Sequence, residues 1–154
     1  KWTTYRKMAE DTMTHAIEVG QLEPQACRTE DLHLHGYLSR EDLPTEDHLH
    51  VYGSEAADVA RLGADTPELN HKLHDRLPYS LAEIAFAARH EMACRLEDAL
   101  ARRTRSPLLD ARASAEAAEK AATVMAAELG HDQAWIKSEV AAYQSLAQGY
   151  LVSS

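Results

Sequence analysis

The second half of the sequence places apolar residues three and four positions apart, a spacing that gathers them on one face of an α-helix. The pattern becomes regular at Ser80, where Glu83 follows three residues later in the form of a capping box, typical of a helix start. The apolar stripe continues to Leu100 with an interruption expected at residues 93–95, and Ser106-Pro107 is predicted to stop it. A chain patterned in this way is expected to fold as packed helices rather than as a sheet.

Two more helices are predicted after that stop. An alanine-rich helix is expected to begin at Asp110 or Ser114 and to end at Leu129, because Gly130 stands where a C-terminal glycine is common. Asp132 can then cap a last helix, whose apolar residues again share one face.

The chain before these helices is organised differently. Residues 21–53 hold prolines and glycines and predict an extended connector with at most one short strand, after which Ser54 can cap the next helix and Pro67 begins a short one. We therefore expect an all-α protein in which residues 54–154 form a compact bundle of five to six helices.

A lone amphipathic helix is predicted for residues 1–20, with Thr3 or Thr4 as its N-cap and Gly20 at its end. The N-terminus of a helix carries unpaired N–H groups and a partial positive charge, and Lys1 adds a cation beside it. A carbonyl edge or a phosphate would bind well there, although a capped helix without any ligand has the same sequence pattern.

Composition excludes several classes of protein. A formal net charge of −9 argues against nucleic-acid binding, which relies on clustered Lys and Arg. No apolar run approaches the ~20 residues of a membrane span, and no signal-peptide pattern is present, so we expect a cytoplasmic protein without a transmembrane segment. Cys27 and Cys94 are too few for a disulfide framework or a thiolate zinc site and are expected to be reduced, partly buried thiols.

The histidines suggest a metal site but do not define one. His33 with His35, and His48 with His50, could each present two imidazoles to one ion in an extended chain. No spacing matches a closed structural site, and the stretch around His90 lacks the second histidine of a zinc-protease helix. We expect no metal site, and no grouping of residues predicts a catalytic centre of the chain's own.

The stretch "ARRTR" is the one basic cluster in an acidic chain. Cations near the C-terminus of a helix are favoured by the helix dipole, which explains some of them. Three arginines in four residues exceed that need, so Arg102, Arg103 and Arg105 are candidates for contact with carboxylates of another domain, or for an anion site.

Three stretches in order, "KWTTYRKMAED", "LPYSLAEIAFAARHEMACRLEDALARRTRSPLLDA" and "VMAAELGHD", resemble the C-terminal region of FAD-dependent glycerol-3-phosphate dehydrogenases of the bacterial, quinone-linked type. The resemblance implies an excised helical C-terminal domain, residues 54–154, preceded by the last helix of the FAD-binding domain at residues 1–20 and by the connector at residues 21–53. The parent enzyme would oxidise sn-glycerol 3-phosphate to dihydroxyacetone phosphate and pass the electrons to quinone, peripherally on the cytoplasmic membrane.

The same resemblance implies the site residues. Lys1 would reach toward flavin and substrate, and Trp2, Thr3 and Thr4 would contact the flavin, just after two glycines that would precede residue 1. The remaining FAD- and substrate-binding residues belong to the parent's other domain, which is also the expected partner, so the piece alone is expected to be inactive and not to bind FAD. Arg95 departs from the family, which usually has threonine there, and this puts a capped helix restart in doubt.

Two alternatives remain open from the sequence. The same kind of domain occurs in glycerol-3-phosphate oxidases, which use oxygen as electron acceptor. A stand-alone helical interaction module would also have this all-helical pattern.

Overall fold

The computed structural model describes residues 2–42 and 48–151, and within these residues every regular element is helical. The chain divides into two compact units, Lys1–Tyr37 and Leu38–Ser154. The all-α fold class predicted from the sequence is confirmed. The described part of the connector forms no strand, and the isolated antiparallel bridge joins Lys72 and Ser80 instead.

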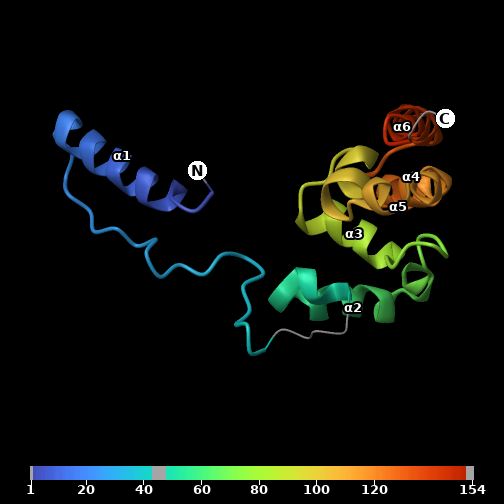
Figure 1. The fold of residues 1–154 in the computed structure, drawn as a ribbon, viewed down its shortest axis with the longest axis horizontal. Helices are drawn as coiled ribbons and strands as arrows, with labels where there is room; N and C mark the ends of the chain where they lie inside the picture. The colour runs from blue at the N-terminus through green and yellow to red at the C-terminus, as the bar shows by residue number, and fades with distance from the viewer. Residues whose placement is uncertain (1, 43–47, 152–154) are drawn as a thin grey trace. The chain divides into compact units, whose positions relative to one another are not determined.

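The first unit consists of helix α1, Tyr5–Gly20, and an extended segment (Figure 1). Thr4 is the N-cap residue, as predicted, but its side chain makes no capping hydrogen bond. Gly20 is the last helical residue, and the left-handed conformation is taken by Gln21, with φ of 52°. The extended segment is tied to α1 through Arg6, whose guanidinium lies 3.4 Å from the hydroxyl of Thr29.

The first helical segment described in the second unit lies earlier in the chain than the sequence predicted. A 3-10 segment, η1 (His48–Glu55), lies where an extended connector was expected, and Glu55 rather than Ser54 precedes helix α2 (Ala56–Asp65). Burial explains the difference, because η1 places Tyr52 edge-on against Phe86 of the core. The short helix predicted at Pro67 is present as η2, Pro67–Asn70.

The rest of the unit is a stack of helices. Their bounds are α3 (Leu81–His90), a π-helical segment η3 (Asp98–Arg103), α4 (Ser106–Glu116), α5 (Ala118–Leu129) and α6 (Gln133–Gln148). Figure 1 shows α2 on one side of α3, with the α4–α5 layer on the other and α6 beyond it. α5 therefore lies between α3 and α6 and forms the centre of the bundle.

Local capping signals account for most helix ends. The capping box of Ser80 and Glu83 is present, the Asp132 carboxylate accepts the N–H of Trp135 at 2.9 Å, and Gly130 is left-handed with φ of 72°. One prediction was wrong: Ser106-Pro107 does not end the helical structure but starts α4, because proline is tolerated in the first helical turn.

Two hydrophobic clusters hold the unit together, and Leu81 and Val124 pack against both. The smaller cluster joins η1, α2, η2 and α3 around Val59 and Phe86. The larger one is rich in alanine, which allows close approach of α3, α5 and α6. Its largest fully buried members are Leu73, Leu77, Ile84, Leu96, Leu100, Met125 and Tyr143.

Candidate functional site

The residues predicted to meet a flavin lie at the start of α1. Trp2 is 89% exposed, and Thr3 and Thr4 are exposed as well, whereas Lys1 lies outside the described residues. The Thr4 hydroxyl points toward the sulfur of Met8, 3.8 Å away, rather than toward a first-turn amide. Backbone amides in the first turn have no acceptor inside a helix, so this terminus can offer N–H groups to an electron-rich ligand edge.

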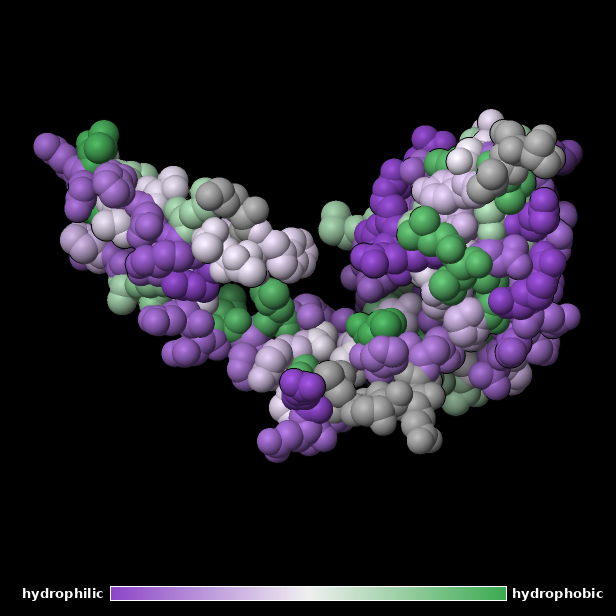
Figure 2. Space-filling model, in the orientation of Figure 1, coloured by the Kyte–Doolittle hydropathy of each residue, from purple (hydrophilic) through white to green (hydrophobic). Residues whose placement is uncertain are grey.

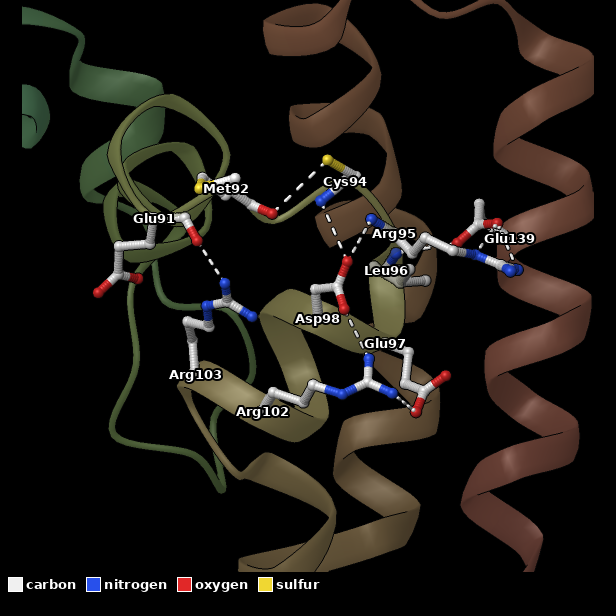
Figure 3. Close-up of polar contacts among 10 residues, drawn as sticks. All are labelled: Glu91, Met92, Cys94, Arg95, Leu96, Glu97, Asp98, Arg102, Arg103 and Glu139. Atoms are coloured by element: carbon white, nitrogen blue, oxygen red, sulfur yellow. Dashed lines mark hydrogen bonds and ion pairs between the residues drawn. The ribbon is translucent and has the colours of Figure 1, made fainter. Parts of the chain in front are cut away.

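A network of polar contacts surrounds the interruption between α3 and η3 (Figure 3). α3 ends at His90, and Met92 takes a left-handed conformation with φ of 57°. The Asp98 carboxylate then accepts the N–H groups of Cys94 at 3.1 Å and Arg95 at 2.9 Å. Although burial disfavours its charged form, these hydrogen bonds lower the pKa of Asp98.

The helical restart after this interruption is capped from a distant helix. Glu139 of α6 accepts the buried N–H of Leu96 at 2.9 Å and pairs with the Arg95 guanidinium, also at 2.9 Å. The restart is therefore capped although position 95 is an arginine, because Asp98 and Glu139 supply the acceptors. The departure from threonine at this position does not leave the helix start unsatisfied.

The arginines predicted to contact another domain are in different environments (Figure 3). Arg102 is held by Asp98 at 2.6 Å and Glu97 at 2.5 Å, and Arg103 donates to the main-chain oxygen of Glu91. Arg105 is exposed, takes a left-handed conformation and has no ion pair with any residue that the structure describes. Two of the three cations are thus engaged inside their own unit, while contact with another domain stays a prediction for all three.

Glu91 carries an unusual carboxylate. Among the described residues, its Oε2 atom is buried without a hydrogen-bond partner. Burial raises the pKa of this carboxyl, and the nearby charge of Arg103 opposes that rise only in part. Its backbone oxygen, by contrast, is satisfied by Arg103.

A second buried carboxylate, Glu83, joins η1 to α3. Its side chain is 1% exposed and accepts the N–H of Ser80 at 2.7 Å. The Nε2 atom of His48 lies 3.0 Å away, and the hydroxyl of Tyr52 donates to it over 3.4 Å. The capping-box pattern identified Glu83 in the sequence, but no sequence signal linked it to His48.

The other residues considered as ligands do not assemble into a site. No cluster of three or more His, Cys, Asp or Glu residues within 2–42 and 48–151 has metal-binding geometry. His33 stacks on Tyr37 with ring centroids 3.9 Å apart. Cys27 and Cys94 are free, as predicted, but both are exposed rather than partly buried.

Among the described residues, the recess where Arg95 and Glu139 meet is smaller than a substrate. A recess beside Arg95 and Glu139 holds about 30 Å³, roughly enough for one water molecule. Ligand pockets are usually ~300 Å³ or larger. No helix among the described residues is long and apolar enough to cross a membrane.

Comparison with known proteins finds relatives that match most of this chain. Residues 27–136 match the family described as the C-terminal domain of alpha-glycerophosphate oxidase. The chain is also 34% identical over 169 residues to a mitochondrial glycerol-3-phosphate dehydrogenase of Arabidopsis thaliana, covering 91% of this chain and 27% of that one. None of the solved structures matches the chain significantly.

Mammalian relatives show the same relation. The mitochondrial glycerol-3-phosphate dehydrogenase of Mesocricetus auratus is 35% identical over 84% of this chain, and the human protein is 33% identical over 86%. The chain spans 20% of the length of each. These relatives are eukaryotic, so they give no support to the expected bacterial type. The chain belongs to the family of the C-terminal domain of alpha-glycerophosphate oxidase, the domain that it shares with the glycerol-3-phosphate dehydrogenases.

Proposed function

We propose that this chain is the C-terminal part of an FAD-dependent glycerol-3-phosphate dehydrogenase. The parent oxidises sn-glycerol 3-phosphate to dihydroxyacetone phosphate and passes the electrons to quinone. The observation that carries the proposal is the identity of 33–35% to named dehydrogenases over 84–91% of this chain. Relatives named as dehydrogenases favour this activity over that of an oxygen-using oxidase.

The start of α1 has the chemistry that a flavin edge requires. Thr4 leaves the first-turn amides without a side-chain cap, and Trp2, Thr3 and Thr4 are all accessible. When bound, FAD accepts a hydride from the substrate carbon that bears the secondary hydroxyl. In this proposal the amides at the helix N-terminus stabilise negative charge at the pyrimidine edge of the flavin, and Lys1 provides a cation toward flavin and substrate.

The helical unit has an accessory role in this proposal. Its polar clusters are satisfied mainly by one another, as the Arg95–Glu139 and Arg102–Asp98 pairs show. It would cover the FAD-binding domain of the parent, and the isolated chain would be inactive and would not hold FAD. In this proposal the parent is a peripheral protein on the cytoplasmic membrane, which holds its quinone.

Kinetics of the full-length parent test the proposal. The purified enzyme is expected to reduce a quinone analogue with glycerol 3-phosphate and to produce little peroxide, whereas residues 1–154 with added FAD are expected to show no activity. Lys1→Met is expected to abolish most activity, while Lys7→Met serves as a matched control, because Lys7 pairs with Glu10 and Asp11 on the exposed surface. Stoichiometric peroxide formation would identify an oxidase instead. Absence of any glycerol 3-phosphate oxidation would refute the proposal.

A further inference from the structure

Two adjacent leucines lie exposed in the first turn of α4. Leu108 is 68% exposed and Leu109 is 62% exposed. Figure 2 shows apolar surface between hydrophilic side chains on the helical unit. Single exposed apolar residues need no explanation, but two consecutive leucines on one turn form a concentrated apolar contact that water solvates poorly.

Buried hydrogen bonds hold the backbone just before these leucines. Ser106 is fully buried, and its hydroxyl lies 2.7 Å from that of Thr104, which itself lies 3.0 Å from the main-chain oxygen of Leu100. Arg105 enters the turn in a left-handed conformation, with φ of 56°. These hydrogen bonds order the backbone that leads into Leu108 and Leu109. A preorganised apolar surface loses little entropy on binding.

The two arginines beside the leucines differ from the arginines that precede them in the helices. Each arginine from Arg61 to Arg103 pairs with a carboxylate or donates to a main-chain oxygen. Arg105 and Arg112, on either side of the leucines in sequence, are exposed and have no ion pair with any described residue. Two exposed arginines beside two exposed leucines can pair with carboxylates that edge an apolar patch on another surface.

We propose that Leu108 and Leu109, with Arg105 and Arg112, form the surface on which the FAD-binding part of the parent docks through an apolar patch edged by carboxylates. This inference rests on the proposed function, since relatives carry 73–80% of their length outside the matched domain. A second copy fits less well, because a two-fold contact centred on the leucines would bring four arginines together. An anionic membrane fits less well too, because the chain as a whole is strongly acidic.

The test compares variants of the full-length parent. Leu108→Ser/Leu109→Ser is expected to weaken docking and to raise the rate of protease cleavage in the connector about 10-fold or more, because docking would bury both leucines. Val51→Ser is the matched control, because Val51 is 70% exposed in the same unit and lies outside the proposed surface. Arg105→Glu/Arg112→Glu is also expected to raise the rate of connector cleavage, because it reverses the charges that would meet carboxylates. Circular dichroism of residues 1–154 should show that none of these changes unfolds the helices.

Other results overturn the inference. Cleavage that is unchanged in both double variants excludes docking through this surface. A loss of dimer in sedimentation, or a loss of vesicle binding, with unchanged connector cleavage would assign the surface to a second copy or to a membrane. Proteolysis needs no substrate, so these outcomes are separate from glycerol 3-phosphate oxidation, whose absence would refute the proposed function alone.

Discussion

Glu139→Ala is expected to destabilise the helical unit strongly. The carboxylate is 6% exposed and does two things: it accepts the N–H of Leu96 and it pairs with Arg95. The hydrogen bond caps the helix start at Leu96, which is fully buried, whereas the Arg95 side chain is 62% exposed. The two contributions therefore differ in size and can be separated.

The magnitudes follow from burial. A buried N–H group left without an acceptor costs about 1–3 kcal/mol. An ion pair with one largely exposed partner contributes about 1 kcal/mol or less. Glu139→Ala should thus lower the free energy of unfolding by about 2–4 kcal/mol, while Arg95→Ala should lower it by under about 1 kcal/mol. Glu139→Gln keeps an oxygen acceptor for Leu96 and should fall between the two.

Urea unfolding of residues 1–154, followed by circular dichroism, measures these differences. The double variant Arg95→Ala/Glu139→Ala completes a cycle, and its coupling energy should be under about 1 kcal/mol. If Arg95→Ala alone costs as much as Glu139→Ala, the ion pair and not the cap holds the restart of the helix. Equal losses for Glu139→Gln and Glu139→Ala would contradict the reasoning as well.

Three more changes test other parts of the fold. Burial raises the pKa of Tyr143 from 10.0 to about 12. The neutral side chain therefore stabilises the fold below pH 10, and this stabilisation is lost as the pH rises toward 12. Tyr143→Phe should remove part of that alkaline loss when unfolding is measured against pH. Because burial raises the pKa of Glu91, Glu91→Gln should stabilise the chain more at pH 7 than at pH 4 when melting temperatures are compared. Gly130→Ala should cost about 1 kcal/mol in urea unfolding through its left-handed backbone alone, since no atom lies within 4 Å of an added Cβ.

Sequence signals within a few residues predicted the helix ends well. Ser80 with Glu83, and Asp132 with Trp135, act through hydrogen bonds between residues three positions apart, so the pattern itself contains both partners. Asp110 also accepts the N–H of Ala113 at 2.9 Å, but it does so at a non-helical residue inside α4 and not at the start of that helix. Such local signals do not depend on how the helices pack.

The errors have tertiary causes. η1 begins at His48 because Tyr52 is buried against Phe86 and Glu83 lies beside His48, contacts that join segments more than thirty residues apart. The cap of Leu96 comes from Glu139, 43 residues further along the chain. Neither partner could be identified from periodicity, which states only that a residue faces inward and not which residue it meets.

Helix α1 also shows that periodicity does not identify the partner of an apolar face. Its predicted apolar face is present, yet Tyr5, Met8 and Met13 are 53%, 48% and 59% exposed, and no residue of the helix is buried within the described chain. Helices in proteins gain most of their stability from packing an apolar face, so a face left open requires a covering surface. In the parent proposed above, the flavin-binding part provides that surface, and the same part meets Leu108 and Leu109 of the helical unit. The local pattern of α1 is therefore complete in the sequence, whereas the surface proposed to cover its apolar face is a contact that periodicity does not identify.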